Sequence, residues 1–429
     1  MFPFTFNTEE QGTQPGGAGL GTELHFDSKS FSFPLQISHI HLIMFASIIL
    51  LCLCVVFLNL LLKSRRPKNF PPGPPILPIL GNILNLSLEN PLKDFERLRK
   101  SYGNVYSLFL GSRPAVIING MKAMKEAMVT KGTDFAGRPQ DLFVNDTQKK
   151  GVILAQYGSS WRDHRRFALT TLRNFGMGKN SMEERIHGEI DYTIDTLEKS
   201  IGSVWYTLRT CQNLTIRLMK EHKETRVPGE PRDFVDCYLD EMDKRGDDGS
   251  SFEEEQLRMY TLDLHFAGTD TTSNTLLTGF LYLMTYPHIQ ERCQQEIDEV
   301  LEGKDRASFD DRHNMPYMQA VIHEVQRIAN TVPLSVPHCT TKDTELMGYS
   351  IPRGEFVKPE AFMPFSAGPR MCLGEGLARM ELFLIMVTLL RKFKFIWPED
   401  AGEPDYTPVY GVTLTPKPYR MEIQLRATQ

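Results

Sequence analysis

The sequence has little of several kinds of residue, and each shortage excludes a class of protein. Its seven cysteines in 429 residues are an odd number, with no CxxC pair and no spacing typical of metal ligands. A disulfide framework and a zinc site are therefore poor interpretations. The net charge of −5 leaves no excess of basic residues, so nothing supports binding to nucleic acid. No internal repeat is visible, which argues against a repeat architecture.

One long hydrophobic run lies near the N-terminus, at residues 40–62. A helix that spans a bilayer needs roughly 20 apolar residues. The basic cluster at residues 63–68 follows at once, which by the positive-inside tendency places the bulk of the chain in the cytosol. A cleaved signal peptide is the alternative, but the run is long, lies well inside the chain and lacks a small-residue cleavage site. We expect a disordered tail over residues 1–37 and a transmembrane anchor over 38–63.

Prolines dominate residues 64–80, which cannot be helical and which we expect to form a stiff linker. A proline-rich ligand for an SH3-type domain is the less favoured alternative. The rest of the chain, residues 81–429, is mainly helical in pattern, with short β-like runs at 105–110 and 114–118.

The longest expected helix extends from Leu257 to about Thr285, and Ser251 with Glu254 is a plausible capping box for it. Pro287 begins a second helix that ends near Gly303. We expect Cys293, on the apolar face of that second helix, to lie in the core.

The segment from Phe365 to Gly374 has the composition of a loop that holds one cysteine thiolate against an iron. Gly368 and Gly374 allow a tight turn and close approach to a flat macrocycle. Arg370 supplies a cation, and backbone N–H groups can point at the sulfur of Cys372. The alternative is an ordinary buried cysteine, which would be favoured if Cys372 stood alone. The spacing of Phe365, Gly368, Arg370, Cys372 and Gly374 favours the interpretation of Cys372 as a haem ligand.

The long helix contains an unusual stretch at residues 267–272, Ala-Gly-Thr-Asp-Thr-Thr. A glycine inside a helix costs about 1 kcal/mol relative to alanine, so something local must compensate. Ala267 and Gly268 leave space for a flat cofactor, and Asp270 and Thr271 place a carboxylate and a hydroxyl able to relay protons beside it. A helix-bending glycine with solvated polar neighbours is the alternative.

Two other pairs have helical spacing. Glu324 and Arg327 share a helix over residues 318–328, where the surrounding aliphatic side chains suggest a buried pair rather than an ordinary surface ion pair. Trp161 and Arg165 lie one turn apart, after an expected cap formed by Ser160 with Asp163, and present an indole N–H and a guanidinium on one face. Simple packing of a tryptophan against an arginine is the alternative for this second pair.

Taken together, these motifs resemble the cytochrome P-450 family. Residues 365–374 are similar to its haem-binding signature, 267–272 to its oxygen-activation motif, and Glu324 with Arg327 to its Glu-x-x-Arg motif. The chain looks like a microsomal member of family 2, in its J-like branch, from Leu42 to the C-terminus.

The resemblance implies a mainly α fold with a minor β-sheet, preceded by one transmembrane helix, at the endoplasmic reticulum membrane with the catalytic domain facing the cytosol. It implies haem b, with electrons from NADPH through NADPH-cytochrome reductase and with cytochrome b5 as a further partner. The reaction would insert one oxygen atom from O₂ into lipophilic substrates such as arachidonate, other fatty acids or xenobiotics.

The resemblance also assigns roles to residues. Cys372 would ligate the iron, Asp270 and Thr271 would act in catalysis, and Glu324 with Arg327 would be structural. The residues that would contact the haem are Trp161, Arg165, Ala267, His338, Phe365, Gly368, Arg370 and Gly374. Arg162 and Arg166 would add positive charge where an acidic electron-transfer partner docks. The substrate pocket would be formed by the loop before Trp161 and by residues 264–267, 331–334 and 411–413.

The sequence departs from the family by two gaps, near residues 198–220 and 354–362. The first removes core helices and part of the substrate lid. The second removes the arginine that normally joins Glu324 and Arg327, and a buried ion pair that loses a partner can be destabilising. The alternative to an active monooxygenase is therefore a catalytically impaired, membrane-anchored haem protein, from splicing or an incorrect gene model, or a product that does not fold stably.

Overall fold

The structure is a computed structural model that describes residues 35–63, 66–87, 90–140, 150–176, 180–199, 208–246, 249, 251–360 and 363–426. The chain divides into two units, Met1–Asn59 and Leu60–Gln429, and each is described by itself. Of the tail expected over residues 1–37, residues 1–34 lie outside the described residues. Residues 35–37 are helical, at the start of α1 (Leu35–Lys63).

The larger unit is mainly helical, as expected. Its described helices are α2 (Pro91–Tyr102), α3 (Met121–Met124), the π-helical turn η2 (Lys125–Thr130), α4 (Ser159–Asn174), α5 (Asn180–Lys199), α6 (Leu208–Thr225), α7 (Phe234–Arg245), α8 (Glu254–Thr285), α9 (Pro287–Val300), α10 (Pro316–Ala329) and α11 (Glu375–Lys392). Short 3₁₀ turns are η1 (Ile83–Asn85), η4 (Phe309–Asn314), η5 (Gly368–Arg370) and η6 (Glu399–Ala401).

The β structure is minor, also as expected. One sheet has the strand order β1-β2-β6-β3, from β1 (Val105–Leu110), β2 (Arg113–Asn119), β6 (Phe356–Glu360) and β3 (His338–Cys339). β2 runs parallel to β6, and the other two pairs are antiparallel. Three two-stranded sheets pair β4 (Thr344–Leu346) with β5 (Tyr349–Ile351), β7 (Phe393–Ile396) with β10 (Glu422–Leu425), and β8 (Val409–Tyr410) with β9 (Leu414–Thr415).

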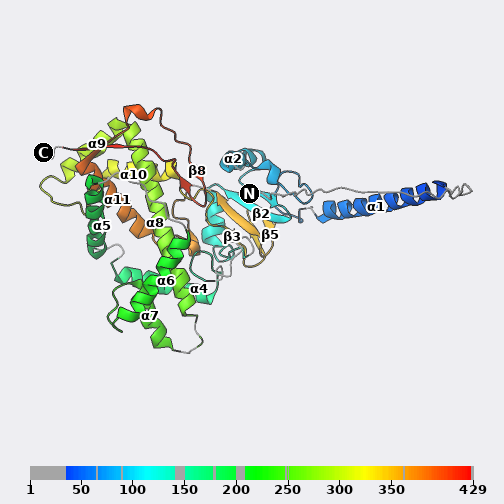
Figure 1. Ribbon diagram of the computed structural model, residues 1–429, viewed down its shortest axis with the longest axis horizontal. Helices are drawn as coiled ribbons and strands as arrows, with labels where there is room; N and C mark the ends of the chain where they lie inside the picture. The colour runs from blue at the N-terminus through cyan, green and yellow to red at the C-terminus, as the bar shows by residue number, and fades with distance from the viewer. Residues whose placement is uncertain are drawn as a thin grey trace, which may run out of the picture. The chain divides into compact units, whose positions relative to one another are not determined.

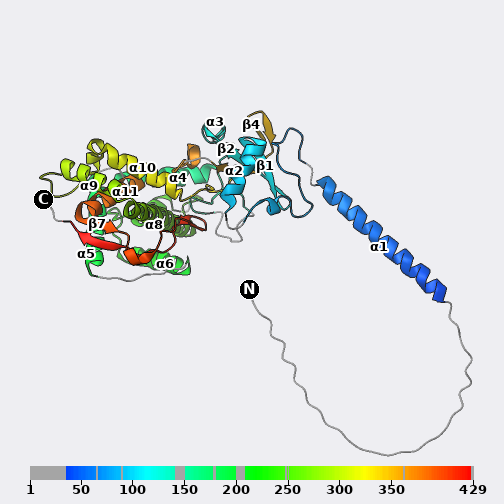
Figure 2. The ribbon, with the colours of Figure 1, turned by 90° about the horizontal axis from the view of Figure 1, so that it is seen from above.

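Helix α8 runs through the helical part of the larger unit and organises it (Figure 1). α9, α10 and α11 pack near its C-terminal end, whereas α6 and α7 pack near its start. The view from above shows β1, β2 and α2 grouped at the opposite end of this unit from α9 (Figure 2). The cysteine loop, between η5 and α11, therefore lies in the chain directly before a helix that packs on α8.

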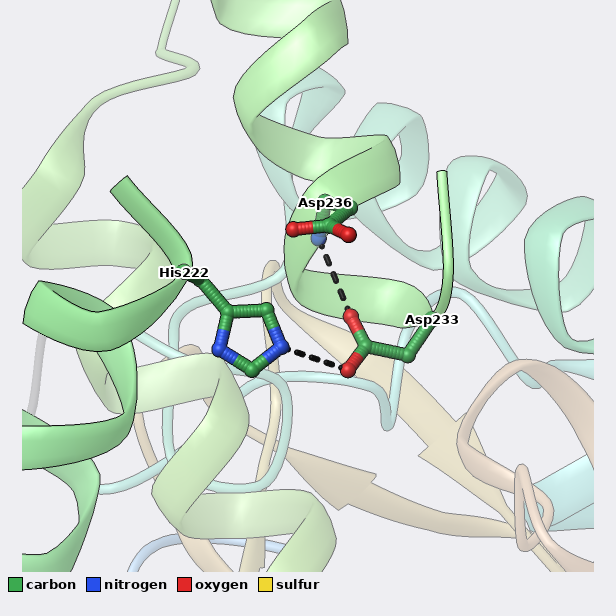
Figure 3. A group of neighbouring side chains, drawn as sticks. All are labelled: His222, Asp233 and Asp236. Carbon is green, nitrogen blue, oxygen red and sulfur yellow. Dashed lines mark hydrogen bonds and ion pairs between the residues drawn. The ribbon is translucent and has the colours of Figure 1, made fainter. Parts of the chain in front are cut away.

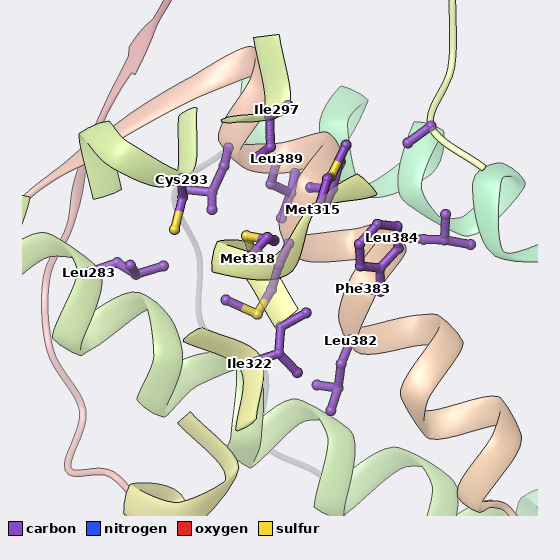
Figure 4. Packing of buried hydrophobic residues seen from close by; sticks show 14 of the residues in the cluster. Leu283, Cys293, Ile297, Met315, Met318, Ile322, Leu382, Phe383, Leu384 and Leu389 are labelled. Atoms are coloured by element: carbon purple, nitrogen blue, oxygen red, sulfur yellow. The ribbon is translucent and has the colours of Figure 1, made fainter. Parts of the chain in front are cut away.

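The largest core cluster joins α8, α9, α10 and α11 (Figure 4). Cys293 and Ile297 of α9 are fully buried in it, together with Met318 of α10 and Leu384 of α11. The expectation that Cys293 is a core residue is confirmed. Burial of such side chains stabilises a domain by roughly 1.5–3 kcal/mol each, so this cluster anchors the C-terminal half.

The prolines at the starts of α9 and α10 lie where the sequence predicts helix starts, whereas the expected serine caps are absent. Pro287 and Pro316 occupy the first turns of α9 and α10, where a missing N–H costs no hydrogen bond. α10 ends at Asn330, which takes the left-handed conformation with φ 38°. Both expected capping boxes are wrong. α8 begins at Glu254 and α4 at Ser159, and neither has a side-chain cap, so Ser251 lies outside the helix and Ser160 within its first turn.

The expectation of a membrane-spanning helix over residues 38–63 is not confirmed. Among the described residues, no helix is both long enough and apolar enough to cross a membrane.

Candidate functional site

The loop that carries Cys372 is fixed by its own backbone. The N–H of Cys372 donates to the carbonyl of Phe365 at 2.8 Å. The thiol is exposed to solvent, yet protein surrounds it closely enough that burial raises its pKa, while the N–H of Gly374 and the charge of Arg165 act in the opposite direction. Cys372 is thus accessible from solvent.

Gly368 cannot be replaced in this loop. Its φ is 73°, and a Cβ on it would lie 1.7 Å from the carbonyl oxygen of Met128 in η2. The glycine therefore lets the cysteine loop pack directly on the π-helical turn. Phe365 contributes differently, since the guanidinium of Arg379 lies over its ring at 4.8 Å.

Arg370 points inward from the same loop and is buried. Its nitrogens donate to three carbonyls, those of Ala136 at 2.9 Å, Val152 at 3.2 Å and Ala155 at 2.7 Å. The guanidinium also lies over the ring of Trp161 at 4.1 Å. Burial, together with the nearby charge of Arg138 and Arg165, lowers the pKa of Arg370 to about 8.

The sequence reasoning missed Arg138, which is 4% exposed and lies in the same site. It donates to the carbonyls of Ile153 and Pro337, both at 2.7 Å. Burial lowers its pKa to about 10. No local spacing in the sequence marks this residue, because its partners come from two segments distant in the chain.

His338 and Trp161, both expected to contact the haem, each make a hydrogen bond to a backbone carbonyl of the protein. His338 is buried in β3, and its Nδ1 donates to the carbonyl of Phe135 at 2.7 Å. Burial and the charges of Arg138 and Arg370 lower the pKa of His338 to about 3, so the ring is neutral. The indole N–H of Trp161 donates to the carbonyl of Val152 at 3.0 Å.

Arg165 completes the group from α4. Its guanidinium lies over Trp161 at 5.4 Å and donates to the carbonyl of Met371, next to the cysteine. Among the described residues, Arg138 and Arg370 pair with carbonyls and with no carboxylate. Two buried guanidinium groups without a counter-charge are costly unless an anion joins them. A haem with two propionates, placed against the thiol, fits this chemistry.

Three of the carbonyls that hold these cations belong to the loop at residues 151–155, and α8 fixes that loop. One carboxylate oxygen of Asp263 accepts the N–H groups of Val152 at 2.7 Å and Ile153 at 2.9 Å. Gln256 exchanges two hydrogen bonds with the backbone of Gly151, at 3.0 and 3.1 Å. Burial raises the pKa of Asp263 to about 6. A carboxylate one turn before Ala267 was the available sequence signal for this role.

The middle of α8 is open, as the sequence predicts. A Cβ built on Gly268 meets no atom within 4 Å outside the helix backbone, and Gly268 is exposed. The Thr271 hydroxyl donates to the carbonyl of Ala267 at 2.7 Å. Asp270 accepts a hydrogen bond from Thr413 at 2.7 Å. The N–H of Leu414, directly after the segment 411–413, donates to the carbonyl of Thr331 at 2.8 Å.

Glu324 and Arg327 form the expected pair, with two hydrogen bonds of 2.7 and 2.6 Å. The expectation that the pair is buried is wrong. Their side chains are 53% and 58% exposed, because none of the described elements covers this side of α10. The mutual hydrogen bonds lower the pKa of Glu324 and raise that of Arg327.

A second cluster of ligand-type side chains joins α6 to α7 (Figure 3). The Nε2 of His222 lies 2.6 Å from Asp233, and the other oxygen of Asp233 caps α7 by accepting the N–H groups of Val235 and Asp236. Asp236 is paired through both oxygens with Arg232. All three ligand-type groups are thus engaged within the protein, and the cluster is a joint between two helices.

Comparison with known proteins gives one consistent result. The family model described as Cytochrome P450 matches residues 71–210, 206–357 and 353–423. Cytochrome P450 2B4 of Oryctolagus cuniculus is 35% identical over 489 residues, covering 89% of this chain and 99% of the relative. Cytochrome P450 2J2 of Homo sapiens is 35% identical over 463 residues, covering 84% of this chain and 92% of the relative.

The alignment with the rabbit protein is longer than the part of this chain that it covers, so this chain is shorter than its relative within the matched region. Of this chain's 429 residues, 89% is about 382, roughly 107 fewer than the 489 that the alignment spans. The three matched parts of the family model meet at residues 206–210 and 353–357. Residues 200–207, beside the first meeting point, lie outside the described residues.

Proposed function

The chain belongs to the cytochrome P450 family, which makes it a monooxygenase of the oxidoreductase class, and we propose that Cys372 supplies the thiolate ligand of its haem iron. The observation that carries the proposal is the exposed Cys372, in the same loop as Arg370, together with the buried guanidinium groups of Arg138 and Arg370, which among the described residues pair with carbonyls and with no carboxylate. When bound, the haem supplies the activation of O₂.

The surrounding residues would bind and orient the haem. Arg370, Arg138 and Arg165 would hold the propionates through charge-assisted hydrogen bonds. His338 is neutral in the present geometry, and a carboxylate beside its ring would favour the protonated form. Gly374 keeps an N–H directed at the sulfur, and Ala267 with Gly268 would leave room for the haem at α8. Phe365 and Gly368 would fix the loop itself.

Asp270 and Thr271 would move protons toward the oxygen side of the site. Thr271 now donates to the carbonyl of Ala267, and a hydroxyl in that position can rotate to donate elsewhere. Asp270 is held by Thr413 and by Asn274, at 2.7 and 3.3 Å. These bonds orient the carboxylate at the same helical turn.

Electrons would come from NADPH through a reductase, with cytochrome b5 as a second donor. Arg162 and Arg166 are exposed on α4, on the helix that also carries Arg165. An exposed cationic face suits an acidic redox protein and would mainly increase the rate of association. The substrates would be lipophilic, with fatty acids such as arachidonate and xenobiotics as the candidates.

A second candidate is a haem protein without turnover. The exposed Glu324–Arg327 pair favours it, because the pair lacks the burial that a supporting element would give. Glu324 and Arg327 would then have no structural role in the haem-side core.

The carbon monoxide difference spectrum of the reduced, membrane-bound full chain tests the thiolate. We expect a thiolate-type Soret band that disappears in Cys372→Ala. Cys237→Ala, a change at a half-buried cysteine of α7, is the matched control and should keep the band. A native chain without the band would contradict the proposal. NADPH consumption with product formation then separates the monooxygenase from the haem protein without turnover.

The site of action would be the endoplasmic reticulum membrane, with the larger unit in the cytosol. The support is the set of exposed apolar side chains on α1, which includes Phe45 at 70% and Leu51 at 64%. Exposed apolar surface of this extent marks a membrane or protein contact.

A further inference from the structure

A pocket of about 410 Å³ lies beside Glu324 of α10. Its walls come from the C-terminal end of α8, the start of α9 and the length of α10, three helices that lie together in Figure 1. Tyr282, Tyr286, Tyr317 and Val321 are among its lining residues. The volume falls within the range of small-molecule sites, and the walls are mainly aromatic and aliphatic, as in such sites.

The polar groups of the pocket are available to a ligand. Among the described residues, no hydrogen bond engages the hydroxyl groups of Tyr282, Tyr286 or Tyr317. Glu324 also lines the pocket, and it is the sole acidic residue there, with no basic residue in the lining. An exposed ion pair such as Glu324–Arg327 contributes little to stability, so a cation arriving from the pocket could replace the guanidinium of Arg327 at low cost.

The aromatic walls also suit a cation. The rings of Tyr282 and Tyr286 are stacked, with centroids 6.2 Å apart and planes at 5°. Tyr317 already holds the guanidinium of Arg292 over its ring at 4.3 Å. Tyrosine faces attract ammonium groups, and this attraction strengthens where water is excluded.

We propose that this pocket binds a lipophilic amine, with an aromatic ring against Tyr282, Tyr286 and Val321 and an ammonium group at Glu324. The site is separate from the loop of Cys372 and shares none of its residues. Its ligand class follows from one acidic group in an aromatic pocket.

Equilibrium dialysis of the purified full chain in detergent tests this, with 1-naphthylmethylamine as the probe and 1-naphthylmethanol as its neutral counterpart. Both probes are measured on the Cys372→Ala background, so that an amine bound to haem iron does not contribute. We expect the amine to bind about fivefold more tightly than the alcohol, or better. Glu324→Gln should bring the two affinities together.

A second experiment fills the pocket with a larger side chain. Ala320 lines it and is exposed, so Ala320→Trp should abolish binding of both probes without unfolding the chain, as checked by circular dichroism. Val321→Phe serves if the first variant does not fold. Equal affinity of the two probes in the Cys372→Ala chain would overturn the proposal, as would undiminished amine binding in a folded pocket-filling variant. Loss of the carbon monoxide band, by contrast, would concern only the haem site.

Discussion

At the residue scale, the site depends on side chains that act on the backbone rather than on the cofactor. Asp263 is the clearest case, since it holds the loop whose carbonyls in turn hold Arg138 and Arg370. Both N–H groups that Asp263 accepts reach the same oxygen atom. An asparagine can therefore keep both bonds through its amide oxygen while losing the charge.

We expect Asp263→Asn to change the pH dependence of folding. Because the folded pKa is raised from 3.8 to about 6, the folded state binds more protons than the unfolded state in that interval, and stability falls as pH rises through it. The loss is on the order of 3 kcal/mol. In Asp263→Asn this slope should be absent. Urea unfolding at a series of pH values measures it, and an unchanged slope would show that another group titrates there.

Sequence reasoning could propose the loop of Cys372 because its candidate residues lie close together in the chain. Phe365, Gly368, Arg370, Cys372 and Gly374 fall within ten residues, so one segment suggests a joint role. The same reasoning missed Arg138 and Asp263, since neither has a partner nearby in the chain. Arg138 and Asp263 act on carbonyl and N–H groups that are 15 to 199 residues away.

At the element scale, two features of the helices differ from expectation for physical reasons. The pair on α10 is exposed because sequence spacing fixes which residues meet on a helix but not what covers them. Neither α4 nor α8 has the expected serine cap, because spacing in the sequence does not fix where a helix begins or which partner a serine hydroxyl finds. Ser251 instead lies within hydrogen-bonding distance of His164, at 3.1 Å between Oγ and Nε2.

The joint between α6 and α7 should be sensitive to pH. Burial of the His222 ring opposes protonation, but hydrogen bonds to Asp233 and to the carbonyl of Leu218 outweigh it, and the pKa of His222 is raised above 6.5. Its contribution to stability is therefore complete below about pH 6.5 and is lost as pH rises through the raised value.

Hydrogen exchange of α6 and α7 amides, corrected for intrinsic rates, measures this contribution. We expect protection to fall as pH rises from about 6.5 through the raised pKa of His222 in the native chain and to change little in His222→Gln. His313→Gln, a change at an exposed histidine of η4, is the control and should behave as the native chain. The same fall in His222→Gln would show that the joint does not depend on His222.

At the scale of the whole molecule, the mainly helical fold with minor β structure followed from the sequence. The apolar runs that became α8, α9, β1 and β2 were sufficient for this. The arrangement around Arg138 was not predictable, because it requires segments that begin near residues 135, 151, 161, 338 and 370 to converge. Pattern within a window carries no information about such convergence.

Removal of residues 1–63 tests the proposed membrane attachment. We expect the full chain to pellet with membranes after an alkaline carbonate wash and the shortened chain to pellet less. Full chains with Leu50→Asp and Leu53→Asp, at side chains 63% and 60% exposed, form the matched comparison and should also be released. Equal pelleting of all three would show that α1 does not attach the chain.

The bonds of Arg370 impose an order on synthesis. Its carbonyl partner at Ala136 precedes it by 234 positions, and Phe135 precedes His338 by 203. A ribosome therefore exposes the acceptor half of the site well before the donor half exists. Those carbonyls stay bonded to water until the last fifth of the chain has emerged. Haem capture by the proposed site would thus belong to the closing stage of translation or to the time after release, however early the N-terminal half has folded.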